Sequence, residues 1–146
     1  MAEGQDIAFA LKSGGTGDIT KSHILWTQTK GLPYIPSGIV YREQLVTVRD
    51  GGIVSAVDAK SGKQLYSQRA AATGRYYASP IAANGNIYLT SLEDGVVTVL
   101  KAGTDKAEVI AKSEAFGERV AATPAIADDM LYVRTASKIY AFAKKK

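Results

Sequence analysis

Ser79-Pro80-Ile81-Ala82-Ala83-Asn84-Gly85-Asn86-Ile87-Tyr88-Leu89 is the stretch of this chain that decides the fold. Its two short apolar runs flank Asn84-Gly85, a pair that favours the positive φ angles of a two-residue β-hairpin turn. A proline recurs every 44 residues, at Pro36, Pro80 and Pro124. Short apolar runs with a period of about 40 to 45 residues are typical of the blades of a β-propeller.

Other positions keep the same spacing around these prolines. Ile87-Tyr88-Leu89 begins seven residues after Pro80, and Leu131-Tyr132-Val133 begins seven residues after Pro124. In the first copy Leu45 comes nine residues after Pro36, which we interpret as a two-residue insertion. Asp128-Asp129 takes the place of the Asn-Gly turn in the last copy, so a hairpin is predicted there as well.

Each repeat is predicted to contain four short antiparallel strands, a to d in chain order. The a strands are expected at 37–41, 79–83 and 123–127, the b strands at 45–49, 86–91 and 130–135, the c strands at 53–58, 96–101 and 138–143, and the d strands at 64–68 and 108–112. A further c strand at 7–12 and d strand at 24–27 precede them, which makes thirteen strands. The fold class is therefore all-β, with about three propeller blades in the chain.

The apolar runs at 53–57 and 96–100 are rich in β-branched residues and nearly continuous. Such runs suit strands that are covered on both faces, as stacked blades require. We therefore expect a set of apolar side chains to be largely buried between blades. The set is Ile53, Val57, Ile87, Leu89, Val97, Val99, Leu131, Val133 and Phe142.

Strand c is followed by Asp58-Ala59-Lys60-Ser61-Gly62-Lys63 and then by the aromatic Tyr66. This motif resembles the quinoprotein-like β-propeller family of pyrroloquinoline-quinone-type repeats, and the resemblance extends from about Ile7 to Lys144. It implies that Trp26, in strand d, docks between neighbouring blades, a place taken by Tyr66 and Ile110 in the next repeats. Since the next repeat replaces the motif with Lys101-Ala102-Gly103, the chain looks like a divergent, non-enzymatic branch.

The predicted domain organisation is one partial propeller over 1–146. It divides into strands c and d of a split blade at 1–30, complete blades at 31–74 and 75–118, and strands a to c of a split blade at 119–146. A closed propeller needs about four to eight blades. We expect either a C-terminal piece of a longer propeller or copies that assemble. The specific prediction is a two-fold symmetric homodimer that closes a six-bladed ring, in which 24–27 of one chain completes the split blade of the other and the strand at 7–11 is surplus.

Composition narrows the function classes. Three of the four net positive charges come from Lys144, Lys145 and Lys146, and no basic stripe interleaves with aromatics, so nucleic-acid binding is not predicted. The start of the chain at 1–5 is polar, and no apolar run reaches the ~18 residues of a membrane span, so no membrane partner is expected. Cysteine is absent, which leaves the redox compartment undefined, and only the resemblance implies a periplasmic or exported parent.

Candidate catalytic residues are sparse. His23 is the single histidine and has no second imidazole for a metal or a proton relay. The glycine-rich 13–17 lacks the ending of a phosphate-binding loop, and we interpret it as a flexible connection. Glu93-Asp94 and Asp128-Asp129 lie at predicted tight turns, where acidic residues serve the backbone. We predict no enzyme and assign no catalytic, cofactor-binding or metal-binding residue.

Loops offer the most suggestive surface. In a propeller the d-to-a and b-to-c connections emerge on one face, a usual place for partners. Tyr and Arg are enriched in protein interfaces, although the tyrosines here also suit packing between blades. The residues expected on this face are Leu32, Tyr34, Arg49, Asp50, Arg75, Tyr76, Tyr77, Glu93, Glu118 and Arg119.

Three functions follow from the sequence. The leading hypothesis is a non-catalytic propeller segment that self-assembles into a ring and serves as a structural or protein-binding scaffold. The alternatives are a fragment of a quinone-dependent dehydrogenase and a module whose upper loops bind carbohydrate or another small ligand.

Overall fold

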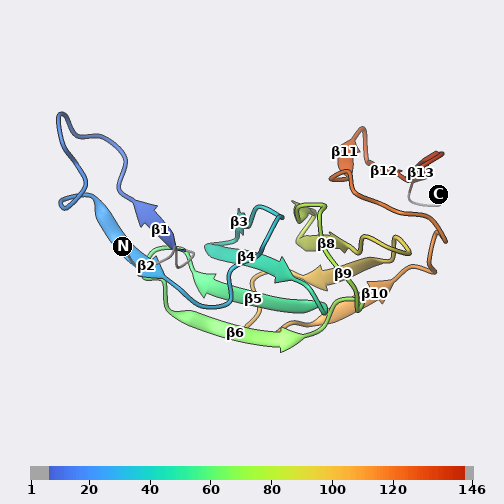
Figure 1. Cartoon of the computed structure of the whole chain (residues 1–146), viewed down its shortest axis with the longest axis horizontal. Coiled ribbons are helices and arrows are strands. Elements are labelled where there is room, and N and C mark those ends of the chain that lie inside the picture. Colours follow the sequence, from blue (N-terminus) through green and yellow to red (C-terminus); the bar gives the residue numbers. More distant parts are fainter. Residues whose placement is uncertain (1–6, 144–146) are drawn as a thin grey trace.

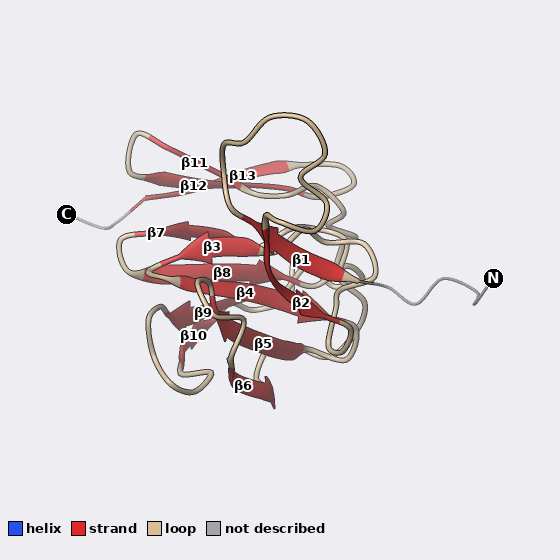
Figure 2. Ribbon diagram, turned by 90° about the vertical axis from the view of Figure 1, so that its left-hand side faces the viewer, coloured by secondary structure: helices blue, strands red, loops and turns tan. Residues whose placement is uncertain are grey.

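The computed structural model describes residues 7–143. All of their regular structure is β-strand, as Figure 2 shows, so the predicted all-β class is confirmed. The polar start at 1–5 and the lysine run 144–146, on which the expectations about targeting and charge rest, lie outside the described residues. The described residues contain no helical segment that could span a bilayer.

Within residues 7–143, thirteen strands form four antiparallel sheets. The N-terminal pair is β1 (Ala8–Leu11) and β2 (Ile24–Gln28). The first blade is β3 (Ile39–Tyr41), β4 (Gln44–Arg49), β5 (Ile53–Asp58) and β6 (Gln64–Arg69). The second blade is β7 (Ile81–Ala83), β8 (Asn86–Thr90), β9 (Val97–Lys101) and β10 (Val109–Lys112). The third blade is β11 (Ala125–Ala127), β12 (Met130–Arg134) and β13 (Ile139–Ala143).

The sheets follow one another along an arc (Figure 1), with the N-terminal pair at one end and the third blade at the other. In each four-stranded blade the strands pair in chain order, from β3 to β6 and from β7 to β10. The first strands of the two complete blades, β3 and β7, contact each other, whereas β6 lies on the outer side of the arc (Figure 1). This is the arrangement of about three blades of a propeller.

Turn chemistry explains the first hairpin of every blade. Asn84-Gly85 and Asp128-Asp129 have positive φ at both central positions, which is the geometry of a type I′ turn. Both predicted hairpins are confirmed. Arg42-Glu43 makes the same turn, with φ of 49° and 61°, although neither residue type predicts it. The three blades therefore share one hairpin length between their first two strands.

Strand register corrects the expected equivalence of Pro36. Ile39 pairs with Val46 as Ile81 pairs with Tyr88, so the first two blades are offset by 42 residues. Ala125 is the equivalent of Ile81 in the third blade, at an offset of 44. The interpretation of an insertion between Pro36 and Leu45 is therefore wrong. At an offset of 42 the equivalent of Pro80 is Gly38, and Leu45 follows Gly38 by seven residues as Ile87 follows Pro80.

Hydrogen bonds between blades give the same alignment. The backbone N–H of Ser37 donates to the Ser79 hydroxyl at 3.0 Å, and the N–H of Ser79 donates to the Thr123 hydroxyl at 3.0 Å. Ser37, Ser79 and Thr123 thus hold equivalent places. Gly38, rather than Pro36, is the equivalent of Pro80.

Two cores of unequal size separate the blades. The larger lies between the first and second blades and includes Val46, Val54, Ile87 and Leu89. The smaller lies between the second and third blades and has Val97, Val120 and Val133 as its buried members.

The nine side chains expected to be buried fall into three groups. Val57, Ile87, Leu89, Val97 and Val133 are buried, as predicted. Ile53, Val99 and Leu131 are half-buried. The prediction is wrong for Phe142, which is 44% exposed. The reason is that cavities of about 470 and 250 Å³ remain open between the second and third blades, and Phe142 lines both.

Candidate protein-binding face

The b-to-c turns and the d-to-a connections meet through backbone hydrogen bonds. Gly51 N–H donates to Gly74 C=O, in the connection that leads to the second blade, at 2.8 Å. Leu92 N–H donates to Arg75 C=O at 2.8 Å, and Leu92 C=O accepts from Val120 N–H at 2.8 Å. These bonds join loops of successive blades into one surface. We call this surface the loop face and define it by Asp50, Arg75, Tyr77, Glu93, Glu118 and Arg119.

Two turn carboxylates hold the connection between the first and second blades. Asp50 Oδ1 accepts a hydrogen bond from Tyr76 N–H at 3.0 Å. Glu93 accepts from Arg75 N–H at 3.0 Å, and its other oxygen accepts from Arg75 Nε at 2.7 Å. The hydrogen bonds from Arg75 lower the pKa of Glu93, and Glu93 in turn raises the pKa of Arg75. Both acidic residues therefore fix loop geometry.

Glu118 links the same two kinds of loop at the third blade, but here the carboxylate lies on the d-to-a connection and the donors lie in the b-to-c turn. Glu118 accepts from the Thr135 hydroxyl at 2.6 Å and from Ser137 N–H at 3.0 Å. The Ser137 hydroxyl adds a bond at 2.8 Å, and Lys138 Nζ lies 3.6 Å away. The Thr135 hydroxyl, followed by Ser137, lowers the pKa of Glu118 to about 2.

The tyrosines of the loop segment divide between core and surface. Tyr76 is 1% exposed, and its hydroxyl donates to Ala72 C=O at 2.5 Å. Burial raises the pKa of Tyr76, which belongs to the larger core. Tyr77 is half-buried, and the exposed Arg119 guanidinium lies 5.6 Å from its ring centroid, within range of a cation–π contact. Arg75 and Arg119 are thus exposed on the loop face, with Tyr77 half-buried beside Arg119.

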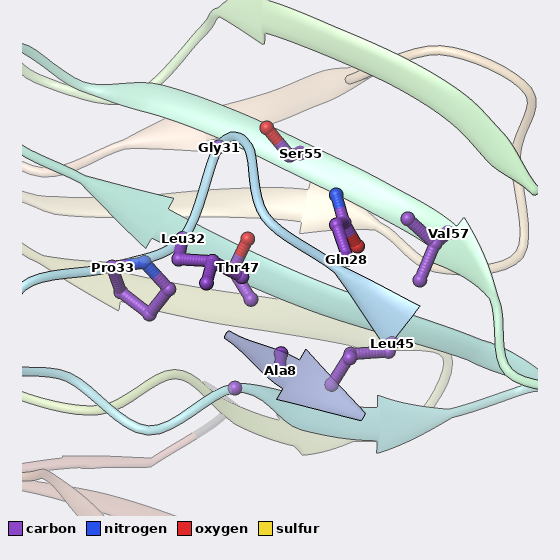
Figure 3. A pocket seen from close by; sticks show the side chains of 10 residues that line it. Ala8, Gln28, Gly31, Leu32, Pro33, Leu45, Thr47, Ser55 and Val57 are labelled. Atoms are coloured by element: carbon purple, nitrogen blue, oxygen red, sulfur yellow. The ribbon is translucent and has the colours of Figure 1, made fainter. Parts of the chain in front are cut away.

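Three further residues were expected on this surface, two of them on the d-to-a connection from β2 to β3. Tyr34 is exposed on the connection from β2 to β3, and Leu32 of the same connection lines a cavity beside the N-terminal pair (Figure 3). Arg49, at the end of β4, is half-buried, and its Nε is enclosed without a hydrogen-bond partner among the described residues.

The other candidates of the sequence have local contacts. His23 Nδ1 lies 2.8 Å from the Ser22 hydroxyl in the loop before β2. Asp128 and Asp129 are the central residues of a hairpin turn. Among residues 7–143, no group of three or more His, Cys, Asp or Glu side chains is close enough together to hold a metal ion.

Sequence reasoning missed the contacts that join the blades. The hydroxyl acceptors Ser79 and Thr123 directly precede two prolines that are 44 residues apart, and this repeated polar position is the signal that marks them. The carboxylate contacts of Glu93 and Glu118 carry no comparable local signal, because their partners lie 18 and 19 residues away.

Trp26 occupies the docking position that the motif implies. Its indole Nε1–H donates to Ala59 C=O at 3.0 Å, on the turn between β5 and β6. A Cβ on Gly62 of that turn would stand 2.6 Å from Trp26 Cγ, so the indole packs directly on the glycine. Asp58 Oδ1 shapes the turn by accepting from Ser61 N–H at 2.7 Å.

Comparisons with known proteins agree with this geometry. A family model described as outer membrane protein assembly factor BamB matches residues 18–146. Among solved structures, BamB from Moraxella catarrhalis is similar with a TM-score of 0.67 and 18% identity, over 82% of this chain and 36% of that one. The computationally designed Ika4 protein has a TM-score of 0.68 and 13% identity, over 86% of this chain and 76% of that one.

A quinohemoprotein alcohol dehydrogenase, ADHIIG from Pseudomonas putida HK5, is also similar, with a TM-score of 0.61 and 14% identity, over 75% of this chain and 23% of that one. At these identities the likeness shows the fold. The chain spans about a third of the length of the Moraxella protein. No curated protein sequence matches the chain.

Proposed function

Because the chain belongs to the family of outer membrane protein assembly factor BamB, whose repeats are of the pyrroloquinoline-quinone type, we propose that it is a non-catalytic propeller segment that binds other proteins through its loop face. The description of the family names a role in protein assembly, and this supports a protein partner. The hypothesis of a quinone-dependent dehydrogenase remains the alternative, supported by the fold likeness to ADHIIG.

The observation that carries the proposal is the fixed geometry of the loop face. Backbone bonds from Gly51, Leu92 and Val120 tie its loops across the blades. Loops held in this way lose little conformational entropy when a partner binds, and less binding free energy is spent on ordering them. A propeller segment with such loops suits the role of a scaffold.

Side-chain chemistry points to the same surface. Glu93 orients Arg75 through its Nε, and Tyr77 orients Arg119 through its ring. Oriented arginines and tyrosines are frequent in the parts of an interface that contribute most binding energy. The partner expected from this set is a protein that presents acidic or carbonyl groups to Arg75 and Arg119.

Site-specific photocrosslinking tests this proposal in cells that produce the chain. A photoreactive residue at Tyr77 or Arg119 should crosslink to proteins of outer membrane assembly, identified by mass spectrometry. Lys63 is the matched control, because it is exposed on the turn between β5 and β6, at the other end of the strands. Crosslinks from Lys63 alone, or equally from all three positions, would contradict a loop-face site.

We also propose that the isolated chain self-associates into a two-fold symmetric dimer with six blades. In the described part of the chain, β13 has no strand beyond it and β1 pairs with β2 alone. Unpaired strand edges and exposed apolar side chains favour association. Phe9 and Leu11 are exposed at one end of the arc, and Ile139 and Phe142 are exposed at the other. Light scattering should report twice the chain mass of 15.5 kDa, and a single chain mass at every concentration would refute the dimer.

A further inference from the structure

Strands β1 and β13 occupy equivalent positions in their sheets. Ala10 of β1 pairs with Trp26 as Ala56 of β5 pairs with Tyr66, so Ala10 and Ala56 are equivalent. Both alanines lie on the third strand of a blade, opposite the aromatic residue of the fourth.

The register of the third blade places Ala141 at the same point. Gln44 and Met130 both follow the first hairpin turn, and they pair with Asp58 and Ala143 respectively. Since Asp58 and Ala143 are equivalent, Ala141, two residues earlier, is equivalent to Ala56. Ala8-Phe9-Ala10-Leu11 therefore aligns with Ile139-Tyr140-Ala141-Phe142.

The two strands match in character at three of these four positions. Phe9 and Tyr140 are aromatic, the next residue is alanine in both, and a large apolar residue follows. The first position differs, because the small Ala8 stands where β13 carries the larger Ile139.

A cavity lies beneath that position. It measures about 140 Å³ and is lined by Ala8 together with Leu45, Thr47 and Val57 of the first blade (Figure 3). Apolar side chains beside such a space lose the contacts that a larger neighbour would supply. The equivalent Ile139, at the far end of the arc, is 73% exposed. The N-terminal end of the arc therefore has an unfilled cavity beside Ala8. The other end has an exposed isoleucine, Ile139, at the position of β13 that is equivalent to Ala8.

We propose that, in the dimer, β2 exchanges its own β1 for β13 of a second copy, whose Ile139 fills the cavity beside the first blade. This step rests on the self-association proposed above. β2 stays in place because Trp26 is anchored on Ala59 and Gly62 of the first blade. In the dimer β1 is released from β2. In the monomer β1 pairs with β2 and covers its edge.

The side chains that would face each other across the new contact are complementary in character. Ile139 and Ala141 share the face of the third blade that points away from the second, because Tyr140 and Phe142 point toward Phe116 and the cavities between those two blades. The side of the first blade that would receive them carries Leu45 and Val57. Apolar surface on both sides favours a second copy as the occupant.

A reversible lock tests the exchange in the full chain, which has no cysteine of its own. Phe9 and Thr27 are directly paired and both exposed, so the double variant Phe9→Cys/Thr27→Cys can bridge β1 to β2 with little disturbance of the core. We expect the oxidised variant to have the mass of one chain, and the reduced variant to have twice that mass. An oxidised variant that still has twice the chain mass would overturn the exchange while leaving self-association intact.

A single chain mass for both the parent and the reduced variant would overturn self-association and the exchange together, and would favour further strands of a longer polypeptide as the occupant of both edges. A second variant tests the register. Thr27→Cys/Tyr140→Cys should form an interchain disulfide on oxidation, because Tyr140 takes the place of Phe9. A failure to crosslink in a dimer of the correct mass would exclude the proposed register.

Filling the cavity from within the chain should have the opposite effect. Ala8→Ile would fill the cavity from β1 and leave no room for Ile139 of the second copy, so we expect the dissociation constant of the dimer to rise by about tenfold or more. Ile139→Ala should raise it similarly. Unchanged dissociation constants for both variants would contradict the role of the cavity.

Discussion

Leu89→Ala and Leu131→Ala compare how much each of the two cores contributes to the free energy of unfolding. Leu89 is 1% exposed in the larger core, next to Thr98, which is fully buried. Truncation of a buried leucine to alanine costs about 2.7 to 5 kcal/mol, and the cost grows with the cavity that remains. Since Leu89 is enclosed by the first and second blades, we expect a loss of about 4 kcal/mol. At about 2 to 4 °C per kcal/mol for a chain of this size, the midpoint of thermal unfolding should fall by roughly 8 to 16 °C.

Leu131→Ala should lower the free energy of unfolding by less than Leu89→Ala does, because Leu131 is half-buried and already lines the open cavities of about 470 and 250 Å³. We expect a loss of about 2 kcal/mol. Leu25→Ala is the matched control, since Leu25 is 54% exposed and its truncation should change stability by less than about 0.5 kcal/mol. The free energies are to be measured by chemical denaturation and the midpoints by calorimetry. Equal losses for Leu89→Ala and Leu131→Ala, or a melting curve of Leu89→Ala that matches the parent, would refute the unequal cores.

Further predictions concern the blade junction, the loop face and the cofactor. Gly62→Ala should destabilise the chain by about 1 to 3 kcal/mol and change Trp26 fluorescence, because the new Cβ would stand 2.6 Å from the indole at a φ of +70°. Gly14→Ala, at a φ of +87° with no atom within 4 Å of the new Cβ, controls for backbone strain alone. An equal loss of stability in Gly14→Ala would contradict the packing role of Gly62. Glu118→Gln should destabilise the chain at pH 7 and much less near pH 2. The folded pKa of Glu118, about 2, lies below the usual 4.5, so the carboxylate contributes stability above pH 4.5 that is lost as the pH falls toward 2. A pH-independent difference in the free energy of unfolding between variant and parent would argue against this role of Glu118. Pyrroloquinoline quinone added with calcium and then dialysed away should leave no stoichiometric chromophore, and a retained one would favour the dehydrogenase alternative.

Local chemistry explains why the strands could be predicted from the sequence. The apolar runs are short, and turn residues such as Asn84-Gly85 and Asp94-Gly95 separate them, so the strand positions follow within one or two residues. Register is a property of pairing between strands, and the recurrence of proline does not determine it. The position of Pro36 is therefore a coincidence of spacing, and the turn at Arg42-Glu43 is imposed by the two strands it joins.

The candidate site was less predictable than the fold. Its loops could be grouped because a propeller brings the d-to-a and b-to-c connections to one face, and the contacts of Arg75 with Glu93 agree with that grouping. Whether a tyrosine points inward depends on the packing of neighbouring blades, which places Tyr76 in the core and leaves Tyr77 half-exposed. The exposure of Phe142 likewise depends on how closely the third blade approaches the second.

Amide hydrogen exchange at β13 tests most directly whether the open end of the arc is covered by a second copy. The amide groups of Ile139–Ala143 that face away from β12 have no partner strand within residues 7–143. We expect these amides to exchange slowly at concentrations where the dimer forms, and to exchange fast when the oxidised Phe9→Cys/Thr27→Cys lock keeps the chain monomeric. Fast exchange of these amides in the parent at every concentration would show that no strand covers β13 and would contradict ring closure by a second chain.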